Sequence, residues 1–259
     1  MQRLMASKVP QVTLFFWVIK ILSTTMGETL ADWMDATFHL GLTGTTLVCG
    51  AAFIAMLFWQ MRTRAYVPAV YWATVILVSI TGTLITDNLT DGFGVSLYVS
   101  TAIFAILLAV VFRLWWRQER TLDIASINTT RREAWYWLAI LVTFALGTAA
   151  GDLITEGWGL GYGPGLALFA ALVAGCYIAY RARVNEVLTF WIAYVLTRPL
   201  GASLGDLLTA PTRTNADYDY TGFGLPRYGV NVLFLAVVIG LVVYLSISKR
   251  DSLEAPAAS

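Results

Sequence analysis

One spacing recurs four times along the chain and constrains its fold more than any other feature. A tryptophan is followed ten positions later by a glycine, and five positions further on by an aspartate. The four copies of this W-x9-G-x4-D pattern are Trp17/Gly27/Asp32, Trp72/Gly82/Asp87, Trp137/Gly147/Asp152 and Trp191/Gly201/Asp206. Because a fixed period marks one structural unit used repeatedly, we expect equivalent residues to occupy equivalent places in four copies of one unit.

Each copy begins in a long apolar run. The chain is 58% hydrophobic and 13% charged, whereas a soluble domain devotes about a quarter of its residues to charge. A membrane-spanning helix needs about 20 apolar residues, and eight runs qualify: 12–34, 41–60, 69–89, 96–117, 134–156, 163–181, 187–209 and 229–247. We predict an all-α integral membrane protein forming a single membrane domain, with eight transmembrane helices arranged as four parallel tandem helical hairpins. The repeats span approximately 12–64, 68–120, 132–184 and 187–250.

The positive charges predict an orientation. If the eight helices alternate in direction, thirteen of the seventeen lysines and arginines flank helix ends on one side, and only Arg213 and Arg227 fall in loops on the other. This asymmetry predicts that both termini are cytoplasmic. A net charge of +1 excludes a basic nucleic-acid surface. The expected partners are the lipid bilayer and a small inorganic cation, with a homo-oligomer left open.

The repeat also predicts the depth of its aspartates. At about 1.5 Å of rise per residue, fifteen residues separate each tryptophan from its aspartate by roughly 22 Å. With the tryptophan ring at the cytoplasmic interface, the aspartate lies in the outer half of the membrane. A small residue four positions after each glycine indicates a close helix contact. Parallel repeats place the four aspartates at equal depth, in one ring or in two pairs, and the sequence does not choose between them.

Polar residues spaced four apart extend from these aspartates along one face of each odd-numbered helix. Ionisable groups inside a membrane segment mark functional paths. The predicted cation-binding or proton-exchanging residues are Glu28, Asp32, Asp87, Asp152 and Asp206, with supporting polar residues Lys20, Thr83, Asp91, Thr148, Glu156 and Arg198. Glu28 is the preferred proton-titrating group, because it lies one turn deeper and occurs in one repeat only.

Two buried cations have no counterpart in the other repeats. Lys20 and Arg198 lie deeper than the aspartates. In one interpretation each is paired with a carboxylate and nothing is transported. In the other they replace a driving cation when the site is empty, or bind an anionic group. Pro199 follows Arg198 and is expected to kink or break the seventh helix.

Hard oxygen ligands suit magnesium, calcium or manganese. The four repeat aspartates are therefore candidate ligands for a bound divalent metal, and His39 is a weaker candidate near the outer mouth. No other cofactor is expected. The sequence has no P-loop, nucleophile elbow, HExxH motif or bis-histidine haem arrangement, so no catalytic residue is assigned and an enzymatic activity stays undecided.

Four long motifs resemble a known family. They read VIKILSTTMGETLADW (18–33), GTLITDNLTDGFGV (82–95), INTTRREAWYWLAILVTFALGTAAGDLITE (127–156) and FWIAYVLTRPLGASLGDLL (190–208). These stretches are similar to bacterial four-repeat membrane proteins known as uncharacterised membrane-anchored proteins, built from a tandem two-helix membrane repeat of unknown function. The resemblance implies the eight-helix fold and a place in the bacterial inner membrane, and it implies no activity.

The function predicted from these residues is that of a transporter or channel for a cation, either a divalent metal or a proton-coupled ion. Its acidic site is expected in the outer half of the helix bundle. One alternative is a non-transporting signalling or scaffold protein whose charges form internal ion pairs. Another is an intramembrane enzyme acting on a lipid or quinone, which ranks last because no nucleophile or cofactor ligand accompanies the acids.

Overall fold

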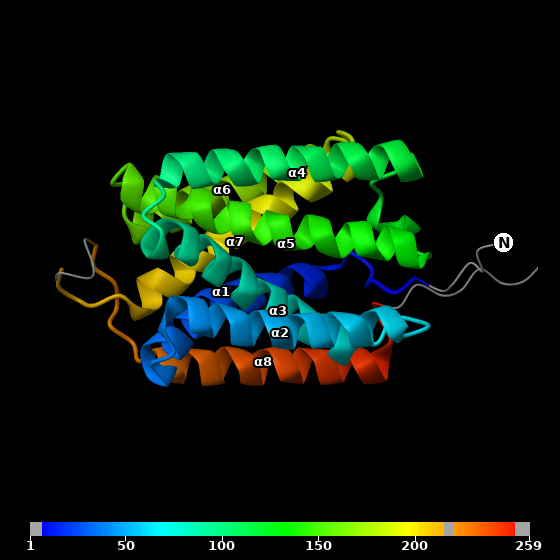
Figure 1. Cartoon of the computed structure of the whole chain (residues 1–259). Helices are drawn as coiled ribbons and strands as arrows, with labels where there is room; N and C mark the ends of the chain where they lie inside the picture. The colour runs from blue at the N-terminus through cyan, green and yellow to red at the C-terminus, as the bar shows by residue number, and fades with distance from the viewer. Residues whose placement is uncertain (1–6, 215–219, 252–259) are drawn as a thin grey trace, which may run out of the picture.

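The computed structural model describes residues 7–214 and 220–251, and throughout this part of the chain the regular structure is helical. Eight long helices of the described residues run side by side (Figure 1). They are α1 (Leu14–Phe38), α2 (Gly41–Arg62), α3 (Pro68–Asp87), α4 (Leu97–Glu119), α5 (Thr130–Asp152), α6 (Tyr162–Arg181), α7 (Glu186–Thr209) and α8 (Arg227–Ser248). Each is long and apolar enough to cross a membrane. The eight predicted spans are therefore confirmed as helices, with bounds shifted by a few residues.

The helices form an inner and an outer layer. Of the residues in the most apolar stretch of each helix, 61–67% are buried in α1, α3, α5 and α7. The share is only 17–22% in α2, α4, α6 and α8. All four inner helices begin at one end of the bundle, at the right of Figure 1, and run to the other. We call these the Trp end and the Asp end, after the repeat residues that each carries. The first helix of every repeat is thus internal and the second is peripheral.

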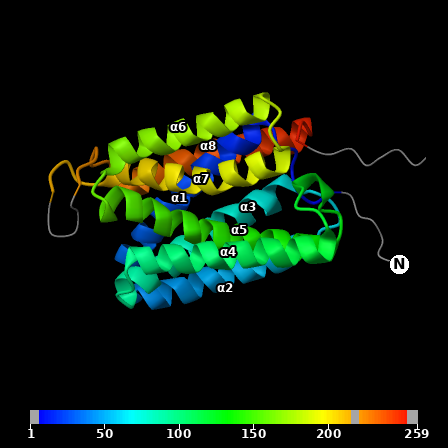
Figure 2. The same cartoon turned by 90° about the horizontal axis from the view of Figure 1, so that it is seen from above.

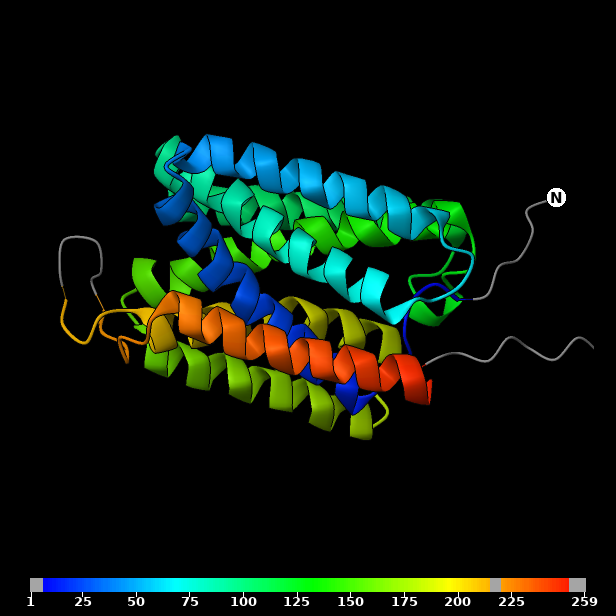
Figure 3. The ribbon, with the colours of Figure 1, turned by 90° about the horizontal axis from the view of Figure 1, so that it is seen from below.

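The inner helices close into a ring. α1 contacts α3 and α7, and α5 contacts the same two helices from the opposite side. Each outer helix packs on the first helix of the following repeat: α4 on α5 and α6 on α7 (Figure 2), and α2 on α3 (Figure 3). α8 completes the cycle by packing on α1 (Figure 3). The four helices that carry the aspartates therefore form a ring.

The repeat glycines make the inner contacts close enough for this ring. A Cβ atom placed on each glycine would lie 1.9–2.7 Å from a side chain of the next inner helix. The four pairs are Gly27 with Ser79, Gly82 with Phe144, Gly147 with Arg198 and Gly201 with Thr24. In every pair the partner stands seven positions after its own repeat tryptophan. The same register therefore recurs around the ring, as small-residue helix contacts in membranes allow.

Two local features differ from expectation. A π-helical segment follows each of the two middle inner helices, η1 (Asn88–Gly92) after α3 and η3 (Leu153–Gly157) after α5, and the sequence did not predict either. Of the kink or break expected at Pro199, the break is wrong, because α7 continues through this residue. Glycine makes room for the proline ring on the neighbouring helix α5, where Cβ atoms on Gly147 and Gly151 would approach Pro199 to 3.2 and 3.1 Å.

Aromatic residues fill the Trp end of the ring. The rings of Trp72, Trp137 and Trp191 are buried inside the bundle, and their expected depth at the membrane interface stays a prediction. The tryptophans pack against other aromatic rings of the inner helices, and the hydroxyls of Tyr71 and Tyr136 meet at 2.5 Å within this cluster. Aromatic side chains therefore occupy the ring axis at the Trp end.

Candidate functional site

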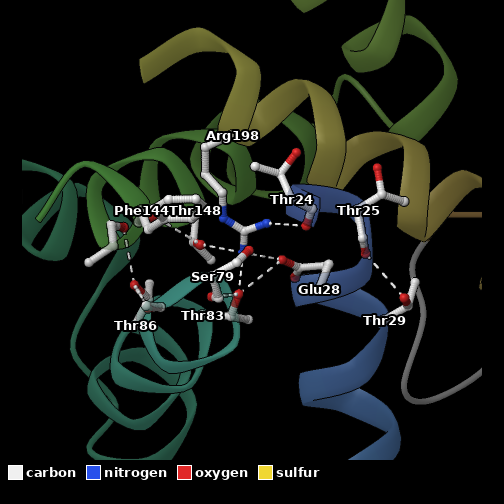
Figure 4. A network of polar contacts seen from close by, with 12 residues as sticks. Thr24, Thr25, Glu28, Thr29, Ser79, Thr83, Thr86, Phe144, Thr148 and Arg198 are labelled. Carbon is white, nitrogen blue, oxygen red and sulfur yellow. Dashed lines mark hydrogen bonds and ion pairs between the residues drawn. The ribbon is translucent and has the colours of Figure 1, made fainter. Parts of the chain in front are cut away.

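An ion pair joins α7 to α1 in the middle of the ring. Arg198 Nη2 lies 2.5 Å from Glu28 Oε2, and the arginine side chain is fully buried. Arg198 Nη1 donates a hydrogen bond of 2.9 Å to the carbonyl oxygen of Thr24 (Figure 4). The cost of burying two charges is offset only when the pair has good geometry and further hydrogen bonds. Both conditions are met at this pair.

Two threonines complete the surroundings of the guanidinium. Arg198 Nη2 donates to the hydroxyls of Thr83 and, at 2.9 Å, Thr148. The Thr83 hydroxyl also lies 3.4 Å from Glu28 Oε2. Glu28, Thr83 and Thr148 all stand eleven positions after their repeat tryptophans. Because one guanidinium contacts the same position of three repeats, it must lie at the centre of the ring.

Lys20 lies buried on the same helix as Glu28, two turns closer to the Trp end. Its ammonium has no hydrogen-bond partner among the described residues. It faces the rings of Tyr194 and Phe144, with Nζ 3.8 and 4.7 Å from their centroids, a geometry that stabilises a cation. The interpretation that each buried cation is paired with a carboxylate therefore holds for Arg198 and is wrong for Lys20, whose ammonium forms no ion pair with any described carboxylate.

The four repeat aspartates lie beyond this pair, towards the Asp end. All four are half-buried. Asp32, Asp87, Asp152 and Asp206 each lie close enough to Glu28 for their charges to interact. Asp32 also stands 3.4 Å from Arg227 Nη2 at the start of α8. The structure thus gathers the five primary acidic residues around one axis, with Glu28 deepest.

The remaining predicted residues lie further out. Asp91 and Glu156 are exposed on the π-helical segments, and Tyr162 donates a hydrogen bond of 3.1 Å to Glu156. His39 is exposed at the end of α1. Among the residues that the structure describes, no three His, Cys, Asp or Glu side chains form a group able to hold a metal ion. The four aspartates therefore surround the axis without forming a ready coordination shell.

Sequence reasoning missed one buried charge pair at the Trp end. Lys8 is one of the thirteen cations that the charge pattern counts at helix ends, yet its Nζ lies 2.7 Å from Glu133 Oε2, with both side chains buried. No short-range pattern joins these residues, which are 125 positions apart. The backbone carbonyl of Thr24, which accepts a hydrogen bond from Arg198, was also missed. Hydropathy patterns carry no information about backbone acceptors.

Comparison with protein families identifies the repeat. The family described as Repeat of Unknown Function (DUF347) matches the chain four times, at residues 15–66, 70–121, 135–184 and 189–251. The chain belongs to this family. The resemblance drawn from the sequence motifs is thereby confirmed. No curated protein and no solved structure matches the chain.

Proposed function

We propose that this member of the repeat family is a proton-coupled cation transporter of the bacterial inner membrane, with both termini in the cytoplasm and the Asp end facing outwards. One observation carries the proposal. Four half-buried aspartates, one from each repeat, lie along the same axis as the buried Arg198–Glu28 pair, on its Asp-end side. A purely structural bundle has no need to place costly acids at the same depth in every repeat.

The order of charges along the axis supports this role. The aspartates provide a negative potential that attracts cations, and their partial exposure lets water and protons reach them. Deeper in the ring, Glu28 is held by Arg198, so an arriving cation or proton must compete with this guanidinium. Protonation of a carboxylate weakens its hold on a cation, which couples the two movements. A proton or a hydrated cation is favoured over a directly coordinated divalent metal, because the described residues offer no cluster of three ligands.

Transport is tested with purified full-length protein in liposomes carrying a pH-sensitive dye. Sodium, potassium, magnesium or manganese is added outside, and proton and metal movements are recorded against protein-free liposomes. The proposal predicts cation-driven proton movement that falls when Asp32, Asp87, Asp152 or Asp206 is changed to Asn. Movement no faster than in protein-free liposomes with every cation, or equal rates for wild type and all four variants, contradicts it.

A non-transporting scaffold is the second candidate, and one observation favours it. Arg198 satisfies Glu28 with an ion pair and hydrogen bonds, which is what a purely structural pair requires. This candidate predicts that the neutral double variant Arg198→Met with Glu28→Gln keeps its function in cells. The transport proposal predicts that the same variant folds but moves no cations, so folding and flux together separate the two.

A further inference from the structure

The short segment before α1 runs across the Trp end of the bundle. It comprises Ser7–Gln11, and three of its residues, Lys8, Val9 and Pro10, are buried, with Lys8 and Val9 only 2% and 1% exposed. Val9 belongs to the same apolar cluster as the buried tryptophans of the inner helices. A segment outside the helices thus supplies part of the core at the Trp end of the axis.

The ammonium of Lys8 is anchored by two acceptors from different helices. Its Nζ donates to Glu133 Oε2 at 2.7 Å, in the first turn of α5, and to the carbonyl of Met61 at 2.8 Å, in the last turn of α2. Gln60 Nε2 donates both to Glu133 Oε1, at 3.2 Å, and to the carbonyl of Lys8, at 3.3 Å. The buried carboxylate of Glu133 therefore binds both Lys8 and the side-chain amide of Gln60, and that amide in turn binds the backbone of the segment.

Backbone hydrogen bonds fix the two ends of the segment. The amide of Tyr66, in the loop after α2, donates to the carbonyl of Ser7 at 3.1 Å. The amide of Gln11 donates to the carbonyl of Asp251, just after α8, at 2.8 Å. The segment therefore bridges three parts of the Trp end that come from different repeats.

We propose that Ser7–Gln11 is a releasable plug that closes the Trp end of the axis, with the Lys8–Glu133 pair as its latch. What the plug closes is the cation path, so this part of the inference rests on the proposed function. The two partners differ in freedom: Lys8 lies outside the helices and returns to water by movement of a short segment, whereas Glu133 is fixed in α5. Removing the carboxylate leaves an uncompensated buried ammonium, which favours release of the segment over loss of the ring.

Release is measured by thiol labelling of full-length protein in detergent. A Val9→Cys reporter is introduced with Cys49→Ser and Cys176→Ser, so that the reporter is the only thiol. We expect slow labelling when Glu133 is present and labelling at least about tenfold faster with Glu133→Gln, because local opening exposes the reporter. The matched control is Glu119→Gln, which removes a carboxylate paired with Arg131 and Arg132 at the same end of the bundle and should leave the rate unchanged.

A second reporter guards against general unfolding. Native Cys49, which is 2% exposed on α2 and is kept as the single thiol with Cys176→Ser and Val9 unchanged, should label at the same slow rate with and without Glu133→Gln. If Val9→Cys labels equally fast in both backgrounds, or if both reporters change together, the latch is contradicted.

Flux in liposomes separates the plug from the proposed function. If wild type transports and Glu133→Gln raises both labelling and flux, the plug is supported as a gate of the path. If wild type transports and flux is unchanged although labelling rises, the gating role is wrong. If labelling rises but wild type shows no flux, the releasable segment stands and the proposed transport function fails.

Discussion

Arg198 and Glu28 meet across the contact that closes the ring, where the last inner helix, α7, returns to the first, α1. Their 2.5 Å ion pair joins residues 170 positions apart. The two residues do not occupy the same repeat position: Arg198 corresponds to Thr24, and Glu28 corresponds to Thr83 and Thr148. The side chain of Arg198 thus extends one helical turn along the axis and contacts Glu28, Thr83 and Thr148 of the other three repeats. The four repeats therefore differ in the side chains that meet at the axis.

A double-mutant cycle measures the interaction energy between Arg198 and Glu28. We expect Arg198→Met alone to destabilise the protein by about 3–5 kcal/mol, because it leaves the Glu28 carboxylate buried without a partner. Adding Glu28→Gln should recover much of that loss, since no uncompensated charge then remains. Thermal or denaturant unfolding in detergent gives the coupling energy. Additive effects of the two changes would show that the ion pair does not form.

The close inner contacts predict opposite effects for two glycine substitutions. In Gly201→Ala the new Cβ would lie 2.0 Å from Thr24 Oγ1 and 2.9 Å from the backbone nitrogen of Thr25, so the helices must separate at a cost of about 1–3 kcal/mol. Gly240→Ala on α8 meets nothing within 4 Å and should be neutral or stabilising, because alanine favours helix. The two melting temperatures test the ring register. Equal shifts would contradict the tight α7–α1 contact.

The environment of the Tyr66 hydroxyl predicts that the free energy of unfolding falls at alkaline pH. Burial, followed by a hydrogen bond of 2.6 Å to Asp251 Oδ2, raises the pKa of the Tyr66 hydroxyl above its usual range. The unfolded chain then ionises first, near pH 10, so the stabilisation is fully present below that pH and is lost as the pH rises further. Tyr66→Phe should therefore cost about 1–3 kcal/mol at pH 8 and less at pH 11. A difference from wild type that is constant between these pH values would contradict this assignment.

The elements of the fold were predictable because each signal is local. Eight apolar runs of sufficient length correspond to the helices α1–α8, and the tryptophan-to-aspartate spacing correctly places Asp32, Asp87, Asp152 and Asp206 at one end. The choice of a ring depends instead on contacts between repeats, such as that of Gly201 with Thr24. Such contacts leave no periodic trace within one repeat.

The partners of the buried charges could not be predicted for the same reason. Two buried cations on the inner helices, Lys20 and Arg198, are candidate partners of Glu28. Only the three-dimensional structure shows that Arg198 binds Glu28 and that Lys20 faces aromatic rings. The π-helical segments after Asp87 and Asp152 were also missed. They overlap the last residues of the predicted spans 69–89 and 134–156, and hydropathy is unchanged by a wider helical turn.

The most direct test of a cation path along the ring axis compares two aspartates of one helix. Asp32 lies near Glu28, whereas Asp35, less than one turn later, contacts Thr45 of α2 at 3.5 Å and so faces the outer layer. Cation-driven proton movement is measured in liposomes with wild type, Asp32→Asn and Asp35→Asn at equal protein content. The account predicts that Asp32→Asn loses most of the flux and that Asp35→Asn keeps it. Equal flux in the two variants, or a larger loss in Asp35→Asn, would contradict it.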